Sequence, residues 1–146
     1  MMTTLLIAIG NRLRRDDGVA HQAVALLALP RCVQVHSVHQ LTPELGEEIA
    51  GFDEVVFVDA ASSETQNPSV EELGEGPVCP TLGHAVSPSA VVTLARRLYG
   101  FRGRVWVCSI PVADFGAGEE LSPAAAATAA RAALVLQVFL EAGRAG

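Results

Sequence analysis

The sequence predicts an α/β fold, a doubly wound, mainly parallel twisted sheet flanked by helices on both faces. Short apolar runs alternate with segments of helical spacing along the whole chain. The run at 54–59 is apolar on both of its faces, which is typical of a central parallel strand. The chain has 146 residues, half of them apolar, so a single domain, 1–146, is expected to enclose a sizeable core.

Turn and capping residues set the boundaries of the predicted elements. Strands are expected at 5–9, 33–38, 54–59 and 104–110, with a short strand-like stretch near 70–73. Helices are expected at 19–29, from 42–43 to 51, from 87–88 to about 99, and from 122–123 onward. Pro30, Gly51 and Gly100 are predicted to stop the first three helices. A Ser or Thr followed by Pro opens each of the last three.

Composition excludes several classes of protein. The net charge is −6, which argues against a basic surface for nucleic acid. Cys32, Cys79 and Cys108 are odd in number and form no C-x-x-C pair, so we expect free thiols in a reducing cytoplasm. The N-terminus lacks the basic region of a signal peptide. The apolar segment 124–140 is interrupted by Arg131 and Gln137, which predicts a buried helix and no membrane segment.

Polar residues occur where strands of the predicted sheet end. Asp16 and Asp17 follow the first strand, Asp59 ends the third, and His84 precedes the third helix. Ligands of such sheets bind at the carboxyl ends of the strands, and two carboxylates with an imidazole suit a divalent metal. The simpler alternatives are that the aspartates cap helix and turn and that His84 is a surface residue. One acid suffices for a cap, so Asp16 is predicted to be structural and Asp17 functional.

Other known sites fit less well. The first turn lacks the G-x-G-x-x-G of dinucleotide-binding proteins, and its acidic pair would repel a pyrophosphate. A flavodoxin-like nucleotide-binding module is therefore disfavoured. No H-E-x-x-H or Ser-His-Asp signal is present. His39 is a reserve ligand for the same crevice, Cys79 is a weaker candidate, and Asn11 is expected to organise the first loop.

Together these segments resemble the hydrogenase maturation proteases. The resemblance begins with Gly10-Asn11-x-Leu13-x-x-Asp16-Asp17-Gly18 and continues through 40–45, Val58-Asp59-Ala60, His84-Ala85-Val86-Ser87-Pro88, 94–100 and 115–122. Their order and spacing span nearly the whole chain. Ala8, Ala20 and Gly83 depart from the family pattern, and none of them is a proposed ligand.

The resemblance implies a function and a site. It implies a cytoplasmic aspartyl-type endopeptidase that removes the C-terminal extension of a nickel–iron hydrogenase large-subunit precursor after nickel insertion. Asp17, Asp59 and His84 match the family's catalytic and metal-contacting positions. The nickel would be supplied by the substrate, and another divalent metal is expected to be able to occupy the site in isolated protein. The alternative is a non-catalytic nickel-precursor binding module, or checkpoint chaperone, that uses the same three residues.

Overall fold

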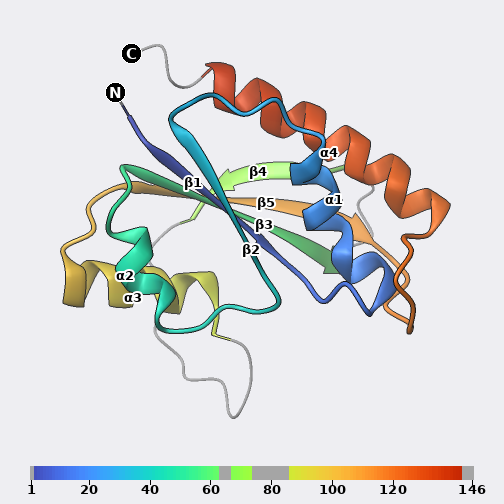
Figure 1. Cartoon of the computed structure of the whole chain (residues 1–146), viewed down its shortest axis with the longest axis horizontal. Helices are drawn as coiled ribbons and strands as arrows, with labels where there is room; N and C mark the ends of the chain where they lie inside the picture. The colour runs from blue at the N-terminus through green and yellow to red at the C-terminus, as the bar shows by residue number, and fades with distance from the viewer. Residues whose placement is uncertain (1, 63–66, 74–85, 143–146) are drawn as a thin grey trace.

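A computed structural model describes residues 2–62, 67–73 and 86–142. Its centre is one five-stranded sheet with the strand order β2-β1-β3-β5-β4 (Figure 1). Four strands are parallel and β4 is antiparallel to β5. The strands are β1 (Thr4–Ile9), β2 (Val33–Val38), β3 (Glu54–Ser62), β4 (Ser69–Glu72) and β5 (Arg104–Val112). The predicted mainly parallel α/β sheet is confirmed.

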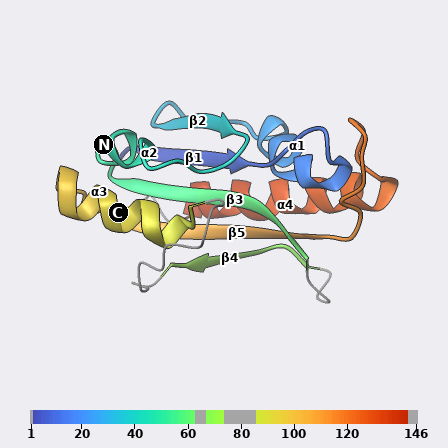
Figure 2. The same cartoon turned by 90° about the horizontal axis from the view of Figure 1, so that it is seen from below.

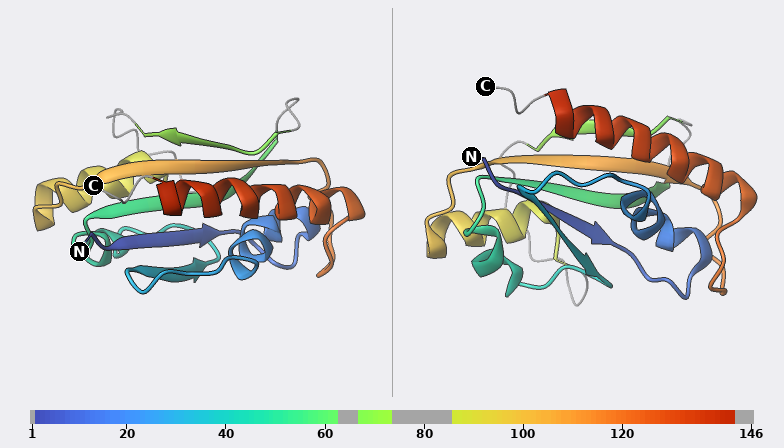
Figure 3. Two further views of the ribbon diagram at one scale, coloured as in Figure 1. Left: turned by 90° about the horizontal axis from the view of Figure 1, so that it is seen from above. Right: turned by 45° about the horizontal axis from the view of Figure 1, so that its top comes forward.

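Helices cover both faces of this sheet and create two apolar cores. Helices α2 (Leu45–Ile49) and α3 (Pro88–Tyr99) cover the face seen in Figure 2. Helices α1 (Val19–Ala25) and α4 (Pro123–Ala142) cover the face seen on the left of Figure 3. Phe57 of β3 packs into the first core and Val58 into the second. Burial on both sides is the reason why β3 is apolar throughout.

The predicted starts of the last two helices are confirmed by their capping bonds. Ser87 Oγ accepts a hydrogen bond from the Ala90 amide at 3.1 Å, and Ser122 Oγ accepts one from the Ala125 amide at 3.2 Å. Gly100 ends α3 with a φ of 72°, a conformation that glycine adopts without steric cost.

Two helices are shorter than predicted. Helix α1 ends at Ala25 instead of reaching residue 29. The reason is a tertiary contact, because the Gln137 side chain of α4 pairs with both the amide and the carbonyl of Ala28. Helix α2 begins at Leu45, and the predicted Thr42 cap is wrong. Residues 42–44 instead form a turn in which the Thr42 carbonyl accepts from the Leu45 amide.

Two strands continue past their predicted ends. Strand β3 continues to Ser62, so the prediction that Asp59 ends it is wrong. The three extra residues, 60–62, pair with residues 110–112 of β5, which itself runs two residues past its predicted end. Proline lacks an amide donor and is tolerated where a strand has a free side. The described part of β4 pairs with β5 only as far as Ser109, so β5 has such a side at Pro111.

Helix α4 is long and apolar enough to cross a membrane by length and composition alone. In the structure it packs along β5 and α1, and its residues Ala125, Ala129, Ala132, Leu136 and Leu140 are buried in the core. This packing agrees with the prediction of a core helix. Leu134 and Val138 remain exposed on its outer side.

Candidate active site

Asp16 is a buried acid that holds two loops together. Only 2% of its surface is exposed. Its carboxylate accepts hydrogen bonds from the Asp114 amide at 3.1 Å, the Ser122 amide at 2.9 Å and Ser122 Oγ at 2.9 Å. The structural role predicted for Asp16 is therefore present, but the predicted form, a helix cap, is wrong. No side-chain cap is present at the start of the short 3-10 helix Arg15–Gly18 or of α1.

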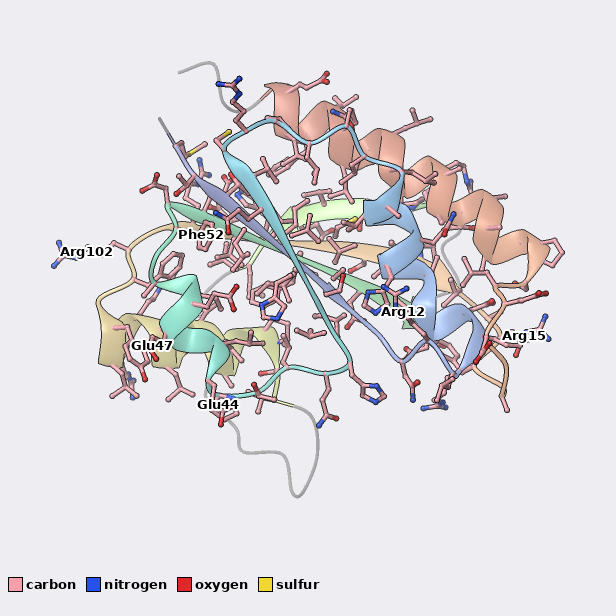
Figure 4. All side chains as sticks on the ribbon, viewed as in Figure 1. Arg12, Arg15, Glu44, Glu47, Phe52 and Arg102 are labelled. Atoms are coloured by element: carbon pink, nitrogen blue, oxygen red, sulfur yellow. The ribbon has the colours of Figure 1, made fainter. Side chains whose placement is uncertain are left out.

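The same loop pairing fixes the turn that carries Asp17. The Arg15 amide donates to the Gly118 carbonyl at 2.8 Å, and Arg15 Nε faces Asp114 Oδ2 at 3.2 Å as an ion pair. Arg15 has a φ of 41°, in the left-handed region that residues with a side chain rarely adopt. The β5–α4 loop thus holds Arg15 in a backbone conformation that this residue would otherwise disfavour. Figure 4 shows Arg12 and Arg15 on this side of the molecule, far from Glu47 and Arg102.

Asp17 is held against the end of β1. Its Oδ2 accepts a hydrogen bond from the Asn11 amide at 2.7 Å, a short, charge-assisted contact. Asn11 Oδ1 in turn accepts from the Leu13 amide at 2.9 Å, so Asn11 organises the loop as predicted. A Cβ atom on Gly10 would lie 1.9 Å from the Asp17 carbonyl oxygen, so this close approach requires glycine.

Asp59 lies on β3, the strand next to β1, near Asp17. It pairs in register with Ile9, the last residue of β1, and is half-buried. Burial and the charge of Asp17 raise the pKa of Asp59 to about 6, against a smaller opposing effect of a backbone hydrogen bond at Ala60. The structure therefore places Asp59 within range of the Asp17 charge at the carboxyl edge. A carboxyl group that titrates near neutral pH can donate or accept a proton there.

Three of the four histidines bear on the candidate site. His84 lies outside the described residues, as does Cys79. His39, the reserve ligand, is exposed after β2. His21, in helix α1, was not among the predicted site residues. It is 7% exposed, and burial lowers its pKa while the nearby Asp17 charge partly opposes that effect. One signal could have identified it, since it is a polar residue among the apolar positions of α1.

The described residues do not by themselves form a metal site. They contain no group of three or more His, Cys, Asp or Glu side chains placed to hold an ion. Asp17 and Asp59 do supply two oxygen ligands whose mutual repulsion a cation would relieve. This donor pair fits a divalent ion that brings further ligands of its own.

Comparison with solved structures identifies the architecture. The hydrogenase maturating endopeptidase HybD from E. coli superposes with a TM-score of 0.73 and 22% identity over 97% of this chain and 94% of the other. The [NiFe] hydrogenase maturation protease HycI from Thermococcus kodakarensis KOD1 superposes with a TM-score of 0.72 and 19% identity, over 95% and 92%. The fold is that of the hydrogenase maturation proteases.

A third structure with this maturation-protease fold is similar in extent. It is the hydrogenase 2 maturation peptidase from Thaumarchaeota archaeon SCGC_AB-539-E09, with a TM-score of 0.68 and 19% identity over 95% of this chain and 98% of the other. No family model and no curated protein sequence matches the chain. The likeness therefore lies in the maturation-protease fold, which spans nearly all of this chain.

Proposed function

We propose that the chain is an endopeptidase that removes the C-terminal extension of a nickel–iron hydrogenase large-subunit precursor after nickel insertion. The observation that carries the proposal is the pair Asp17 and Asp59, which a maturation-protease fold holds together at the carboxyl edge of its sheet. The sequence motifs around both residues support the same assignment. We propose His84 as the third member of the site and a cytoplasmic location for the protein.

Recognition through nickel carried by the substrate follows from the incomplete site. Two carboxylates and one imidazole leave coordination positions open on a divalent ion. Nickel already bound by the precursor would join these ligands and place the scissile peptide beside Asp17 and Asp59, which raises the rate by positioning. Two routes of attack fit the residues. Either the substrate's metal polarises the carbonyl or activates water, or an aspartate acts as general base.

The test is incubation of the purified full chain with nickel-loaded and nickel-free precursor, followed by mass spectrometry of the precursor's C-terminus. We expect cleavage of the nickel-loaded form only, and loss of most activity in Asp17→Asn, Asp59→Asn and His84→Ala. The matched control is Glu47→Gln, an exposed acid of α2 at the opposite end of the molecule (Figure 4). Efficient cleavage of nickel-free precursor would contradict recognition through the metal.

The same experiment separates the alternative function. A nickel-precursor binding module, or checkpoint chaperone, would bind the loaded precursor through the same three residues and release it uncut. Binding that depends on Asp17 and Asp59 without any change in precursor mass would favour that alternative.

A further inference from the structure

A buried histidine and the candidate site share one peptide group. His21 Nε2 lies 2.8 Å from the Gly10 carbonyl oxygen. The amide on the other side of that peptide bond belongs to Asn11 and donates to Asp17 Oδ2 at 2.7 Å. The Gly10–Asn11 peptide is rigid and planar, so contacts at its two ends fix one plane. His21 and Asp17 therefore hold the same peptide from opposite sides.

The protonation pattern of His21 follows from its partner. A carbonyl oxygen only accepts, so Nε2 must carry a proton. Burial lowers the pKa of His21, which favours the neutral ring. The remaining nitrogen, Nδ1, is then a bare acceptor, and it is buried without a hydrogen-bond partner among the described residues. An unpaired buried nitrogen destabilises a protein. An apolar side chain would avoid this at a position flanked by buried Val19, Ala20, Ala23 and Val24.

We propose that His21 is a positioning residue for Asp17, acting through the Gly10–Asn11 peptide. A donor on the carbonyl polarises the peptide and strengthens its amide as a donor to the Asp17 carboxylate. The Gly10 amide, in the preceding peptide group, donates to the Val38 carbonyl at 3.0 Å, so the chain that leads into the Gly10–Asn11 peptide is anchored to the end of β2. His21 thereby couples the orientation of Asp17 to the rigid sheet. The importance of that orientation for cleavage rests on the proposed function.

The test compares two substitutions that differ in one donor. His21→Gln retains a nitrogen donor of similar reach, and His21→Leu removes it. In ¹H–¹⁵N spectra of the metal-free full chain, the Asn11 amide proton should lie downfield in the wild type, move upfield in His21→Leu, and return most of the way in His21→Gln. Asp17→Asn identifies the signal by removing its charged acceptor. The matched control is His36→Gln. His36 Nδ1 lies 2.7 Å from Glu48 Oε2, a contact separate from those of the Gly10–Asn11 peptide.

Cleavage of nickel-loaded precursor gives the functional readout. We expect His21→Leu to lower kcat about tenfold while KM changes little, and His21→Gln to recover most of that loss. An Asn11 amide that does not respond to His21→Leu, or equal behaviour of Leu and Gln, would overturn the proposal. Should His21→Leu fail to fold, ¹⁵N spectra of the wild-type histidines decide, because a bare Nε2 on His21 also overturns it. If neither the wild type nor any variant cleaves precursor but the amide shifts occur, the proposed function is wrong, whereas the positioning of Asp17 by His21 is still supported.

Discussion

Strand β3 carries a carboxylate at each end of its buried segment, and the two have opposite surroundings. Glu54, at the amino edge, is 3% exposed, and its two oxygens accept from Thr4 Oγ1 at 3.2 Å and Trp106 Nε1 at 3.0 Å. Asp59, at the carboxyl edge, lies beside a second acid, Asp17. Glu54 is surrounded by donors, whereas Asp59 lies near a like charge whose effect a backbone hydrogen bond at Ala60 only partly offsets.

This difference distinguishes a structural acid from one available for chemistry. Donors stabilise the charge of Glu54 and link β3 to β1 and β5. The carboxylate therefore needs no cation or proton for its stabilisation. At the carboxyl edge the burial of Asp59 and its repulsion with Asp17 raise the free energy of the doubly ionised pair. A cation or a proton relieves that repulsion, and perturbed carboxyl groups of this kind mark candidate functional sites. Asp16, one residue from Asp17, belongs with Glu54 because its oxygens are occupied by donors.

The largest expected effect contrasts the two edges in catalysis. Asp17→Asn and Asp59→Asn should each lower single-turnover cleavage of nickel-loaded precursor by about 10²–10⁴-fold, the range for loss of acid–base chemistry. Circular dichroism should remain native, because these residues contribute little to the core. Glu54→Gln should keep most of its activity once folded, since it lies at the other edge. Equal loss of activity in all three variants would remove the distinction between the edges.

The next effect concerns the stability that Asp16 provides. Asp16→Ala leaves the Asp114 amide, the Ser122 amide and Ser122 Oγ without their acceptor, so the free energy of unfolding should fall by about 2–4 kcal/mol. Urea denaturation measures this fall. The control is Glu119→Ala, an exposed acid of the same loop, which should change stability by less than about 0.5 kcal/mol. A fall no larger than that of the control would show that Asp16 does not hold the loops.

A smaller effect should appear in the pH dependence of stability. The pKa of Asp59 is raised to about 6 in the folded protein, above its usual 3.8. Its stabilising contribution is therefore fully present below pH 3.8 and is lost as the pH rises through 6. Relative to wild type, metal-free Asp59→Asn should gain about 1–2 kcal/mol between pH 4 and pH 8, after allowance for solvent screening. Glu47→Gln should show no such gain in parallel urea titrations, and a flat difference for Asp59→Asn would contradict the raised pKa of Asp59.

The smallest effect is the metal affinity of the free protein. Three ligands of two kinds, without a thiolate, make an incomplete site, so calorimetric titration with nickel or zinc should show weak binding. His84→Ala and Asp59→Asn should weaken it further, and Glu54→Gln should leave it unchanged. Nanomolar nickel binding that survives His84→Ala would show that a complete site exists elsewhere.

Sequence patterns determined the layers of the fold and selected the two acids of the candidate site. Alternating strand and helix segments predict the parallel sheet, and a strand apolar on both faces predicts its central position. The starts at Ser87 and Ser122 follow from local chemistry, because capping bonds span only three residues. Asp17 and Asp59 were predicted to lie near each other for a related reason. Parallel strands run in one direction, and Asp59 lies in register with the end of β1, after which the chain leads to Asp17.

Tertiary contacts decided what local patterns do not encode. Helix α1 stops early because Gln137, more than a hundred residues away in sequence, binds the Ala28 backbone. Strand β3 passes Asp59 because β5 offers further pairing. The hydrogen bonds of Asp16 to the β5–α4 loop and of His21 to Gly10 likewise depend on which segments meet in space. Periodicity and capping describe a residue's neighbours along the chain, whereas a buried polar atom's partner is chosen by the packed fold.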